Sequence, residues 1–467
     1  MTSLDNIKTI HFVGIGGISM SGLAEIMLHA GYTVTGSDLN HSNIIDRLTQ
    51  KGAVVTIPHE SKNVEGSQLV VYTAAVKQDN PELIRARELA IPIIDRAEFL
   101  GIIMKKHHYG IAISGTHGKT TTTSMVSLIF MDALLDPTIL LGGELEAIKG
   151  NVLIGKSEYF ITEACEYVES FLKFYPYVAA ILNIEEDHLD YFKDLDHIMT
   201  AFYKFVSLIP EDGALIACAD SDNTMKIAAT AKCNVITYGL QASADFTANN
   251  IKYDQLGHPY FDVYYKGEKL DEFSLNIPGR HNVLNSLAAI AIAVNAGISL
   301  DIIKSSLLSF GGTYRRFYIK GTQNDITVID DYAHHPTAIK ATLDAAKQYP
   351  HKKVWCIFQP HTYTRTKTLF KEFTKAFHGA DNVIITDIYA AREKDNGDIH
   401  IMDLVNEVNN QSNNATYIKD FEEIANFIVS NAQPGDIVFT MGAGDIYKLS
   451  EIILDKLKQE ILTPCAC

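Results

Sequence analysis

The chain has 467 residues, of which 47% are hydrophobic and 21% charged, as expected for a globular protein with about three domains. Its formal charge of −16 argues against nucleic acid or an anionic membrane as the main partner, because both require clustered cations. The six cysteines are scattered along the chain, which indicates free thiols in a reducing cytoplasm. Cys465 and Cys467 lie in a C-terminal segment that we expect to be frayed. No segment reads as a secretory signal or a bilayer-spanning helix, so we expect a cytoplasmic protein of enzyme size.

The first hundred residues alternate between strand and helix around a glycine-rich turn. A strand over 9–13 leads into the turn, which contains Gly14, Gly16, Gly17 and Ser19, and Asp38 follows the second strand. This order is typical of a βαβ nucleotide fold, in which an acidic residue after the second strand contacts a ribose hydroxyl. Ser19 replaces the third glycine of the dinucleotide pattern, so the turn predicts a diphosphate site without establishing NAD.

Further elements of this first domain are predicted from apolar runs and capping residues. They are a helix over 23–30, strands over 32–35, 53–57 and 68–73, a helix over 43–51, and a helix opened by Asn80 and Pro81.

The strongest single motif of the chain is a phosphate loop at 114–121. An apolar strand over 109–113 runs into Gly115, Thr116, His117, Gly118, Lys119, Thr120 and Thr121, and a helix is expected by 124–133. Backbone N–H groups and the helix N-terminus form an anion site, Lys119 supplies a point charge, and the Thr120 hydroxyl binds Mg²⁺. Ile113 stands where the full pattern has its first glycine, so the loop is a variant.

Two acidic clusters follow neighbouring strands of the same predicted sheet, whose strands include apolar runs at 137–141, 159–162 and 177–184. Glu163 and Glu166 follow the second of these runs, and Asp187 and His188 follow the third. Carboxyl ends of parallel strands gather at one edge, where ligands bind. We therefore predict that a carboxylate of these clusters and the imidazole of His188 hold Mg²⁺ beside Lys119, in phosphoryl-transfer chemistry. The alternative is that these residues are helix N-caps and solvated acids.

A helix beginning near residue 280 carries two amides on one face. Asn282 and Asn285 are three residues apart, next to a run of Ala and Ile. These residues alone leave two interpretations open: the amides cap a neighbouring loop, or they read the edge of a nucleobase. Just before this helix, 245–276 predicts β-hairpins at an antiparallel edge of the central sheet.

The last third of the chain alternates again after a hinge at 310–317. Strands are expected over 326–329, 354–358, 382–386 and 437–440, and helices over 337–348 and 368–377. The strand ends carry polar side chains that would line one cleft. These are Asp330, Asp331, Tyr332, His334, His335, Gln359, His361, Arg365, Asp387 and Asp445.

Together these patterns predict an α/β protein with three domains. Residues 1–105 form a Rossmann-like domain, 106–312 a central P-loop ATPase-like parallel sheet with an antiparallel edge, and 313–467 a second Rossmann-like domain. Such a protein is an ATP-using enzyme with substrates bound between domains. A P-loop hydrolase would leave the third-domain His and Arg side chains without a role, and a nicotinamide-dependent oxidoreductase would leave Lys119 without one.

The ordered set of motifs resembles the Mur ligase family over almost the whole chain. The motifs begin at Gly14, Ser114, Glu163, Asn183, Gly279, Arg315, Asp330 and Phe358. The resemblance implies ATP-dependent amide formation in cytoplasmic peptidoglycan synthesis, with UDP-N-acetylmuramate and L-alanine as substrates. A ligase that attaches a whole murein peptide to the same UDP-sugar is a related alternative.

The resemblance also implies roles for particular side chains. Lys119 would neutralise the transferring phosphoryl group, Thr120 and Glu163 would bind one Mg²⁺, and His188 would serve a second. Asn282 and Asn285 would hold adenine, and Arg316 and Asp331 the phosphates and ribose of ATP. Substrate contacts would come from Gly16, Gly17, Ser19 and Asp38 for the UDP moiety, and from Tyr332, His334, His361 and Arg365 for the amino acid and muramoyl group. Some relatives have arginine directly after His361, where this chain has Thr362.

Overall fold

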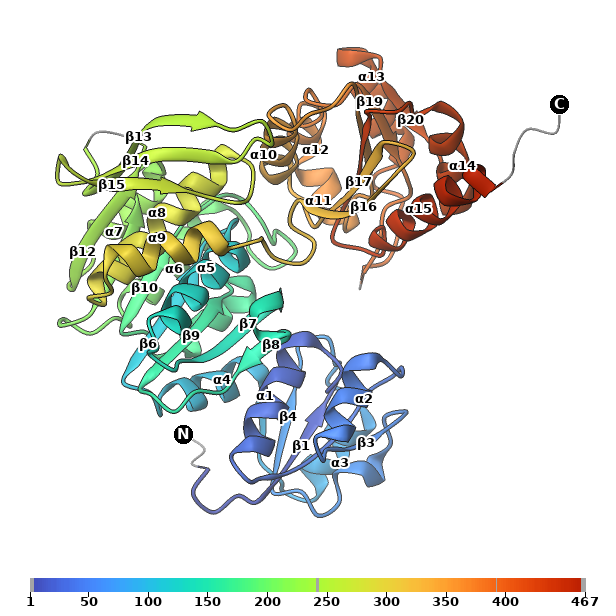
Figure 1. The fold of residues 1–467 in the computed structure, drawn as a ribbon. Helices are drawn as coiled ribbons and strands as arrows, with labels where there is room; N and C mark the ends of the chain where they lie inside the picture. Colours follow the sequence, from blue (N-terminus) through green and yellow to red (C-terminus); the bar gives the residue numbers. More distant parts are fainter. Residues whose placement is uncertain (1–3, 241–242, 392, 463–467) are drawn as a thin grey trace. The chain divides into compact units, whose positions relative to one another are not determined.

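A computed structural model of the protein describes residues 4–240, 243–391 and 393–462 (Figure 1). By their contacts, the residues form two compact units. The first comprises the chain up to Glu185 together with Asp196–Tyr238 and Ala288–Ile303. The second comprises Glu186–Leu195, Gly239–Leu287 and the chain from Lys304. Residues Cys465 and Cys467 lie outside the described part of the chain.

The N-terminal sheet belongs to the first unit and has the Rossmann order predicted for it. Its strands run β3-β2-β1-β4-β5, and every neighbouring pair is parallel. The strands are β1 (Thr9–Val13), β2 (Thr33–Ser37), β3 (Val54–Thr56), β4 (Leu69–Tyr72) and β5 (Ile93–Asp95). The helices are α1 (Ile18–His29), α2 (Asn43–Gln50), η1 (Ser61–Val64), α3 (Pro81–Glu88) and α4 (Arg96–Met104). Asn80 caps α3 and Pro81 occupies its first turn, as the sequence predicts.

The phosphate loop lies on a second, larger sheet, whose strands in the first unit follow the order β12-β11-β10-β6-β9-β7-β8. All these pairs with a described register are parallel except β7 and β8, which are antiparallel. The strands are β6 (Tyr109–Ser114), β7 (Thr138–Leu145), β8 (Gly150–Leu153), β9 (Tyr159–Ala164), β10 (Val178–Ile181), β11 (Ala214–Cys218) and β12 (Asn234–Gly239). The helical segments are α5 (Lys119–Asp132), η2 (Glu146–Ile148), η3 (Tyr167–Lys173), α6 (Leu195–Val206) and α7 (Asp222–Ala228). Helices α8 (Arg280–Asn295) and α9 (Leu300–Ser309) each begin in one unit and end in the other.

The second unit contains the predicted antiparallel hairpins and a third sheet. The hairpins are β13 (Phe246–Tyr253), β14 (Pro259–Tyr265) and β15 (Glu268–Ser274). The third sheet has the order β16-β17-β21-β18-β19-β20, parallel except for its first pair. Its strands are β16 (Tyr318–Gln323), β17 (Ile326–Asp331), β18 (Val354–Phe358), β19 (Asn382–Ile385), β20 (Ala415–Tyr417) and β21 (Ile437–Met441). Its helices are α10 (Pro336–Ala346), α11 (Tyr363–Thr368), α12 (Phe370–Phe373), α13 (Ile401–Ser412), α14 (Phe421–Asn431) and α15 (Tyr447–Leu462).

The third sheet is buried on both faces, which explains the continuous apolar run of β18. Cys356 and Phe358 belong to one core cluster, whereas Trp355 and Ile357 belong to another. Side chains of a strand alternate between faces, so the two clusters lie on opposite sides of the sheet. Among the described helices, none combines the length and apolar character needed to cross a bilayer.

The α/β architecture with three sheets is confirmed, but three predicted helix boundaries are wrong. Helix α1 begins at Ile18 and α5 at Lys119, each about a turn before the predicted start, because the glycine turns pass directly into helix. Where a helix was predicted over 368–377, α11 ends at Thr368 and α12 covers only Phe370–Phe373; the two are separated at Leu369, whose φ of −98° and ψ of 24° depart from helical values.

Candidate active site

The phosphate loop is a tight turn whose backbone only glycine adopts easily. Strand β6 ends at Ser114; Gly115 then has a φ of +137° and Gly118 a φ of +84°. A Cβ on Gly115 would lie 3.0 Å from the backbone nitrogen of Asn183. Helix α5 starts at the next residue, Lys119, so its N-terminus faces the loop. The loop therefore has the geometry of an anion site.

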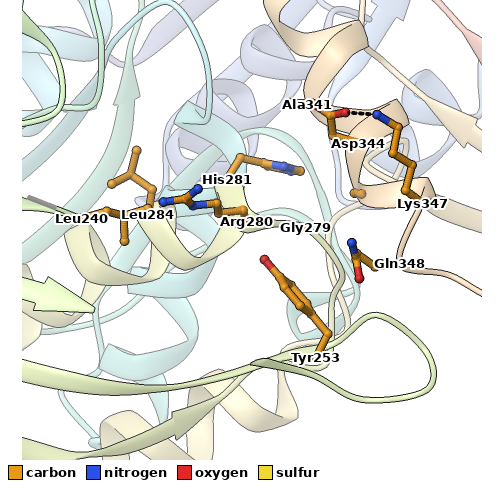
Figure 2. Close-up of a pocket in the computed structure, with 11 residues that line it drawn as sticks. Leu240, Tyr253, Gly279, Arg280, His281, Leu284, Ala341, Asp344, Lys347 and Gln348 are labelled. Carbon is orange, nitrogen blue, oxygen red and sulfur yellow. Dashed lines mark hydrogen bonds and ion pairs between the residues drawn. The ribbon is translucent and has the colours of Figure 1, made fainter. Parts of the chain in front are cut away.

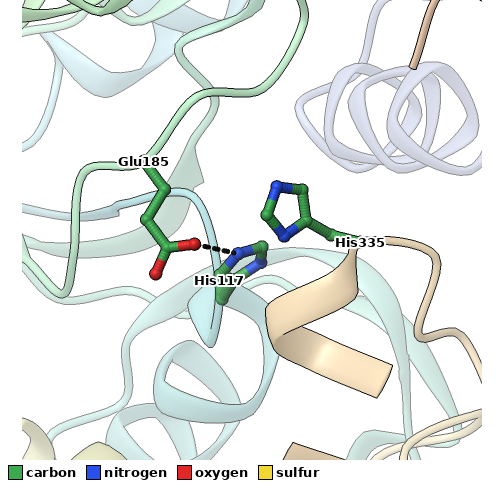
Figure 3. A group of neighbouring side chains, drawn as sticks. All are labelled: His117, Glu185 and His335. Atoms are coloured by element: carbon green, nitrogen blue, oxygen red, sulfur yellow. Dashed lines mark hydrogen bonds and ion pairs between the residues drawn. The ribbon is translucent and has the colours of Figure 1, made fainter. Parts of the chain in front are cut away.

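Asn183, just after β10, holds this loop in place. Its Oδ1 accepts a hydrogen bond from the backbone nitrogen of His117 at 2.8 Å, and its Nδ2 donates to the carbonyl of His117 at 3.1 Å. Two residues on, the backbone nitrogen of Glu185 donates to Thr116 Oγ1 at 2.9 Å, and the Glu185 carboxylate lies 3.3 Å from His117 Nε2 (Figure 3). The loop is thus ordered by protein groups alone.

Lys119 lies within the loop, against a buried carboxylate. Its Nζ donates to the carbonyls of Gly115 and Thr116 and lies 3.1 Å from Glu166 Oε2. The side chains of Lys119 and Glu166 are 16% and 4% exposed. Burial disfavours the charge, but the neighbouring Glu166, Cys165 and Glu163 together outweigh burial and raise the pKa of Lys119. Lys119 is therefore a fixed cation.

Thr120 and Glu163 lie side by side, as predicted for a metal pair. Thr120 Oγ1 donates to Glu163 Oε2 at 2.9 Å, and the other oxygen of Glu163 accepts from the backbone nitrogen of Gly142 at 2.6 Å. A hydroxyl and a carboxylate next to a phosphate loop are the oxygen donors that Mg²⁺ prefers. The predicted ligand set therefore fits the ion at these two residues. Thr121, the next residue of α5, is buried.

In the second unit, the predicted substrate residues His334, His361 and Arg365 gather around Asp187. Arg365 donates to Asp187 Oδ1 through Nε at 3.0 Å and through Nη2 at 2.8 Å. Arg365 Nη1 lies 3.2 Å from His361 Nδ1. Burial opposes ionisation of Asp187, but the neighbouring His188 and Arg365 hold its pKa well below the usual range. Asp187 thereby orients Arg365.

His188 and His334 belong to the same polar cluster. His188 has a φ of +53°, and its Nε2 lies 3.8 Å from Asp187 Oδ2. His334 Nδ1 is 2.8 Å from the carbonyl of Tyr332. Burial, together with the charge of Arg365, lowers the pKa of His334 well below its ordinary value. His334 is therefore neutral at physiological pH, with one nitrogen able to accept a proton or hydrogen bond.

The two arginines at the start of the third sheet have different environments. Arg315 lies 3.0 Å from Asp330 and donates to the carbonyl of Gly442 at 2.7 Å, which is a structural role. Arg316 lies over the ring of Tyr332, with its guanidinium carbon 5.1 Å from the ring centroid. Arg316 is the residue predicted to contact ATP.

Asp331 is less free to meet a ligand than the sequence suggests. One oxygen accepts from the backbone nitrogen of Ala333 at 2.7 Å, and the other accepts from the backbone nitrogen of Phe317 at 2.8 Å and from Thr342 at 3.2 Å. Burial raises the pKa of Asp331, and the charge of Arg316 opposes that rise. The carboxylate fixes the backbone beside Arg316, so its first role is to position that segment.

Helix α8 brings Asn282 and Asn285 together, and both are buried. Asn282 Nδ2 donates to the carbonyl of Pro278 at 2.7 Å, and Asn285 Nδ2 donates to Asn282 Oδ1 at 3.1 Å. The first turn of the same helix borders a cavity of about 470 Å³ (Figure 2). The described residues that line it include Tyr253, Arg280, His281, Lys347 and Gln348, but neither asparagine.

Asp38, which the sequence predicts to contact the ribose or UDP moiety, hydrogen-bonds to the N-terminal glycine turn. Asp38 Oδ2 accepts from the backbone nitrogen of Gly16 at 2.8 Å. A Cβ on Gly16 would lie 2.9 Å from that oxygen, so glycine is required for this close approach. Gly17 caps α1, and Ser19 lies in its first turn. These four residues therefore share one site at the carboxyl edge of the first sheet.

Glu166 in the first unit and Asp187 in the second were not predicted as site residues. Glu166 lies three positions after Glu163, and Asp187 lies immediately before His188. The sequence signals their presence, because both belong to acidic clusters that follow strands. It does not indicate which carboxylate of each cluster meets a cation in the fold.

The fold and the site together define a class of protein. A glycine turn leading into a helix, a buried lysine and a hydroxyl–carboxylate pair at the end of a parallel sheet form a nucleotide-phosphate site. Two further sheets of α/β type each carry polar residues at their strand ends, which is where ligands commonly bind in parallel sheets.

The chain belongs to the Mur ligase family. Residues 9–108 match the family's model "Mur ligase family, catalytic domain", 113–293 match "Mur ligase middle domain", and 315–444 match "Mur ligase, glutamate ligase domain". The chain is accordingly an ATP-dependent ligase that forms amide bonds.

Relatives with assigned names match along their full length. The UDP-N-acetylmuramate–L-alanine ligase of Caldanaerobacter subterraneus subsp. tengcongensis is 52% identical over 98% of this chain and 99% of its own. That of Clostridium acetobutylicum is 55% identical over 97% of this chain and 98% of its own. A solved structure of the UDP-N-acetylmuramate–alanine ligase of Thermotoga maritima has a TM-score of 0.83 at 30% identity, covering 97% of this chain and 99% of that one. A murein peptide ligase of Psychrobacter arcticus has a TM-score of 0.73 at 26% identity, covering 96% of this chain and 98% of that one.

Proposed function

We propose that this protein joins L-alanine to the carboxyl group of UDP-N-acetylmuramate, with conversion of ATP to ADP and phosphate, in cytoplasmic peptidoglycan precursor synthesis. The observation that carries the proposal is the phosphate loop, in which Lys119 is a fixed cation beside the Thr120–Glu163 pair. Full-length relatives at 52% and 55% identity that are named for this reaction support the choice of substrates.

In the first step, the muramoyl carboxylate attacks the γ-phosphorus of ATP. A P–O bond to the carboxyl oxygen forms, the bond to the β-phosphate oxygen breaks, and ADP leaves, giving an acyl phosphate. Negative charge spreads over the oxygens of the transferring group. Lys119, held in the loop, would neutralise part of that charge without having to reorganise.

In the second step, the amine of L-alanine attacks the acyl carbon and phosphate leaves. The attacking amine must be neutral, and it loses a proton as the amide forms. His334 is a neutral imidazole in the cluster with His361 and Arg365, so it is the candidate to accept this proton. Arg365, oriented by Asp187, would bind the carboxylate of the amino acid as a planar cation.

We assign Mg²⁺ to the oxygens of Thr120 and Glu163, with His188 as ligand of a second ion. When bound, the metal would neutralise phosphate oxygens and orient the triphosphate. Glu163 is held ready for this role by the backbone of Gly142.

The remaining predicted residues are assigned to the UDP moiety, to ATP and to the amino acid. The glycine turn with Gly16, Gly17, Ser19 and Asp38 would bind the UDP moiety, and Asn282, Asn285, Arg316 and Asp331 would serve ATP, with Asp331 acting through the backbone beside Arg316. Tyr332 would complete the amino-acid site. The proposal also includes the two domain boundaries predicted from the sequence, at residues 105 and 312.

The test is to incubate the full-length protein with UDP-N-acetylmuramate, ATP, Mg²⁺ and one of several acceptors. L-alanine, glycine, L-serine and the murein tripeptide are compared by phosphate release and by the mass of the product. We expect stoichiometric phosphate and amide with L-alanine at the highest kcat/KM. A higher kcat/KM with tripeptide would assign the protein to peptide recycling instead, and phosphate release without an acceptor would indicate a hydrolase.

A further inference from the structure

A buried carboxylate beneath the glycine turn of the first sheet has no role in the reaction described so far. Glu82, on α3, is fully buried. Its Oε2 accepts from Ser37 Oγ at 2.5 Å, and its Oε1 accepts from Asn63 Nδ2 at 2.6 Å. Two imidazoles complete the surroundings, with His59 Nδ1 at 3.3 Å and His11 Nε2 at 3.6 Å from Oε2.

Glu82 is ionised although no lysine or arginine is paired with it among the described residues. Burial raises its pKa, but the nearby imidazole of His11 and the hydrogen bonds from Ser37 and Asn63 outweigh burial, and the net pKa lies below the ordinary value. A buried charge of this kind is expensive for a fold to keep and is concentrated at functional sites. We therefore expect Glu82 to have a functional role.

The hydrogen bonds of Glu82 fix which nitrogen of His59 carries a proton. An ionised carboxylate only accepts, so the hydroxyl proton of Ser37 points to Glu82. The Ser37 oxygen then accepts from His59 Nδ1, which lies 2.8 Å away. The tautomer with its proton on Nδ1 presents a lone pair at Nε2.

His59 lies next to the predicted substrate turn. The carbonyl of Ser37 accepts from the backbone nitrogens of Gly14 at 2.8 Å and Ile15 at 3.0 Å, so the same residue supports both the turn and His59. The side chain of His59 is 9% exposed, and Nε2 has no hydrogen-bond partner among the described residues. An unpartnered nitrogen at the carboxyl edge of a parallel sheet is placed to meet a ligand.

Two apolar side chains are exposed at the same edge. Leu39 follows β2 and is 64% exposed, and Ile57 follows β3 and is 42% exposed. Because β2 and β3 are parallel neighbours, both side chains belong to the carboxyl edge where His59 also lies. Exposed apolar groups beside a polar acceptor suit a flat heterocycle with a polar rim.

We propose that His59 Nε2 accepts a hydrogen bond from N3–H of the uracil ring, with Ser37 and Glu82 as positioning residues that set the tautomer. This inference rests on the proposed UDP-sugar substrate. Uracil carries hydrogen at N3 and cytosine does not, so this contact selects uridine over cytidine nucleotides. A site that is built to pair with a donor rejects the analogue that lacks it.

The first test compares binding of UDP and CDP to the full-length protein by calorimetry. We expect the wild type to prefer UDP by at least about tenfold, the factor that a lost hydrogen bond commonly produces. His59→Asn, which keeps the Nδ1-like donor to Ser37 but lacks Nε2, should reduce the preference to about twofold or less. His29→Asn, an exposed histidine at the far end of α1, is the matched control and should keep it.

Kinetics and NMR distinguish a substrate-positioning role of His59 and Glu82 from a role in packing alone. His59→Asn should raise KM for UDP-N-acetylmuramate about tenfold, with KM for ATP and L-alanine unchanged within about twofold. In the wild type at pH 8, ¹⁵N shifts should place the His59 proton on Nδ1, and added UDP should move the Nε2 resonance. Glu82→Gln should lower the UDP preference with the fold intact; if that variant does not fold, the wild-type tautomer and the His59→Asn data decide.

A proton on Nε2, or an unchanged UDP preference in His59→Asn, would overturn the inference. Failure of the proposed function is distinguishable, because in that case the wild type would not ligate L-alanine to UDP-N-acetylmuramate. A protein that ligates normally but binds UDP and CDP alike without regard to His59 would refute only the present inference.

Discussion

Removing the charge of Lys119 should separate the catalytic and structural roles of the phosphate loop. A cation about 4 Å from a transferring phosphoryl charge, at an effective dielectric constant of about 20, contributes about 4 kcal/mol. Its loss in Lys119→Met should therefore lower kcat about a thousandfold. The assay is phosphate release coupled to a colour reaction, at saturating ATP, UDP-N-acetylmuramate and L-alanine.

The same substitution also has a cost in stability, because of Glu166. The Glu166 side chain is 4% exposed and would be left without its cation. Removing one partner of a buried ion pair costs about 3–5 kcal/mol, so Lys119→Met should lower the free energy of unfolding by that amount. The double variant Lys119→Met/Glu166→Gln removes both charges and should recover most of the stability, as measured by urea unfolding.

The double variant is the decisive control. It should recover most of the wild-type stability and remain about a thousandfold slower. Recovery of turnover to within about tenfold of the wild type would show that Lys119 acts only as the partner of Glu166, and the assignment of the loop to phosphoryl transfer would be refuted.

Three further substitutions test other parts of the site. Glu163→Gln should raise the Mg²⁺ concentration for half-maximal turnover at least about tenfold, because a neutral amide binds the ion weakly; an unchanged magnesium titration would remove Glu163 from the metal site. Gly142→Ala places a Cβ 3.0 Å from the Glu163 oxygens and should lower kcat about tenfold with little change in Tm, whereas Gly311→Ala, where a Cβ meets nothing within 4 Å, should leave kcat unchanged. Burial and the charge of Arg316 lower the pKa of His281 to about 4. In the unfolded chain the imidazole has a pKa of about 6.5, so between about pH 6.5 and pH 4 the unfolded state binds a proton that the folded state does not. The free energy of unfolding therefore falls as pH falls through this range, and His281→Asn should remove up to about 2 kcal/mol of that loss at pH 5. Urea unfolding at pH 7 and pH 5 measures this, and an equal loss in both proteins would contradict it.

Contiguous motifs allowed the site to be located from the sequence. The turn from Gly115 to Thr120 needs only local geometry: a strand, two glycines with positive φ and a helix start. A carboxylate could be placed near Thr120 because β9, which carries Glu163 near its end, is the parallel neighbour of β6, which leads into the loop. Local patterning and the rule that strand ends converge therefore account for the part of the site that was predicted.

The remaining contacts depend on pairings that no local pattern encodes. Asp187 and Arg365 are 178 positions apart, and Ser37 and Glu82 are 45 apart. The family resemblance implied that Asp331 contacts ATP, but its oxygens bond to the backbone nitrogens of Phe317, just before β16, and of Ala333, just after its own strand. Packing of distant elements decides which polar group is used internally and which is left for a ligand.

The bonds between Asn183 and the phosphate loop have a consequence for inhibitor design. The side-chain amide of Asn183 bonds to both the backbone nitrogen and the carbonyl of His117. The entropic cost of ordering this segment is therefore incurred when the chain folds and not when a ligand binds. A compound directed at the loop thus meets a rigid surface, and its affinity depends on how well its own shape and charges match that surface. Stiff phosphate mimics should consequently outperform flexible ones of equal charge.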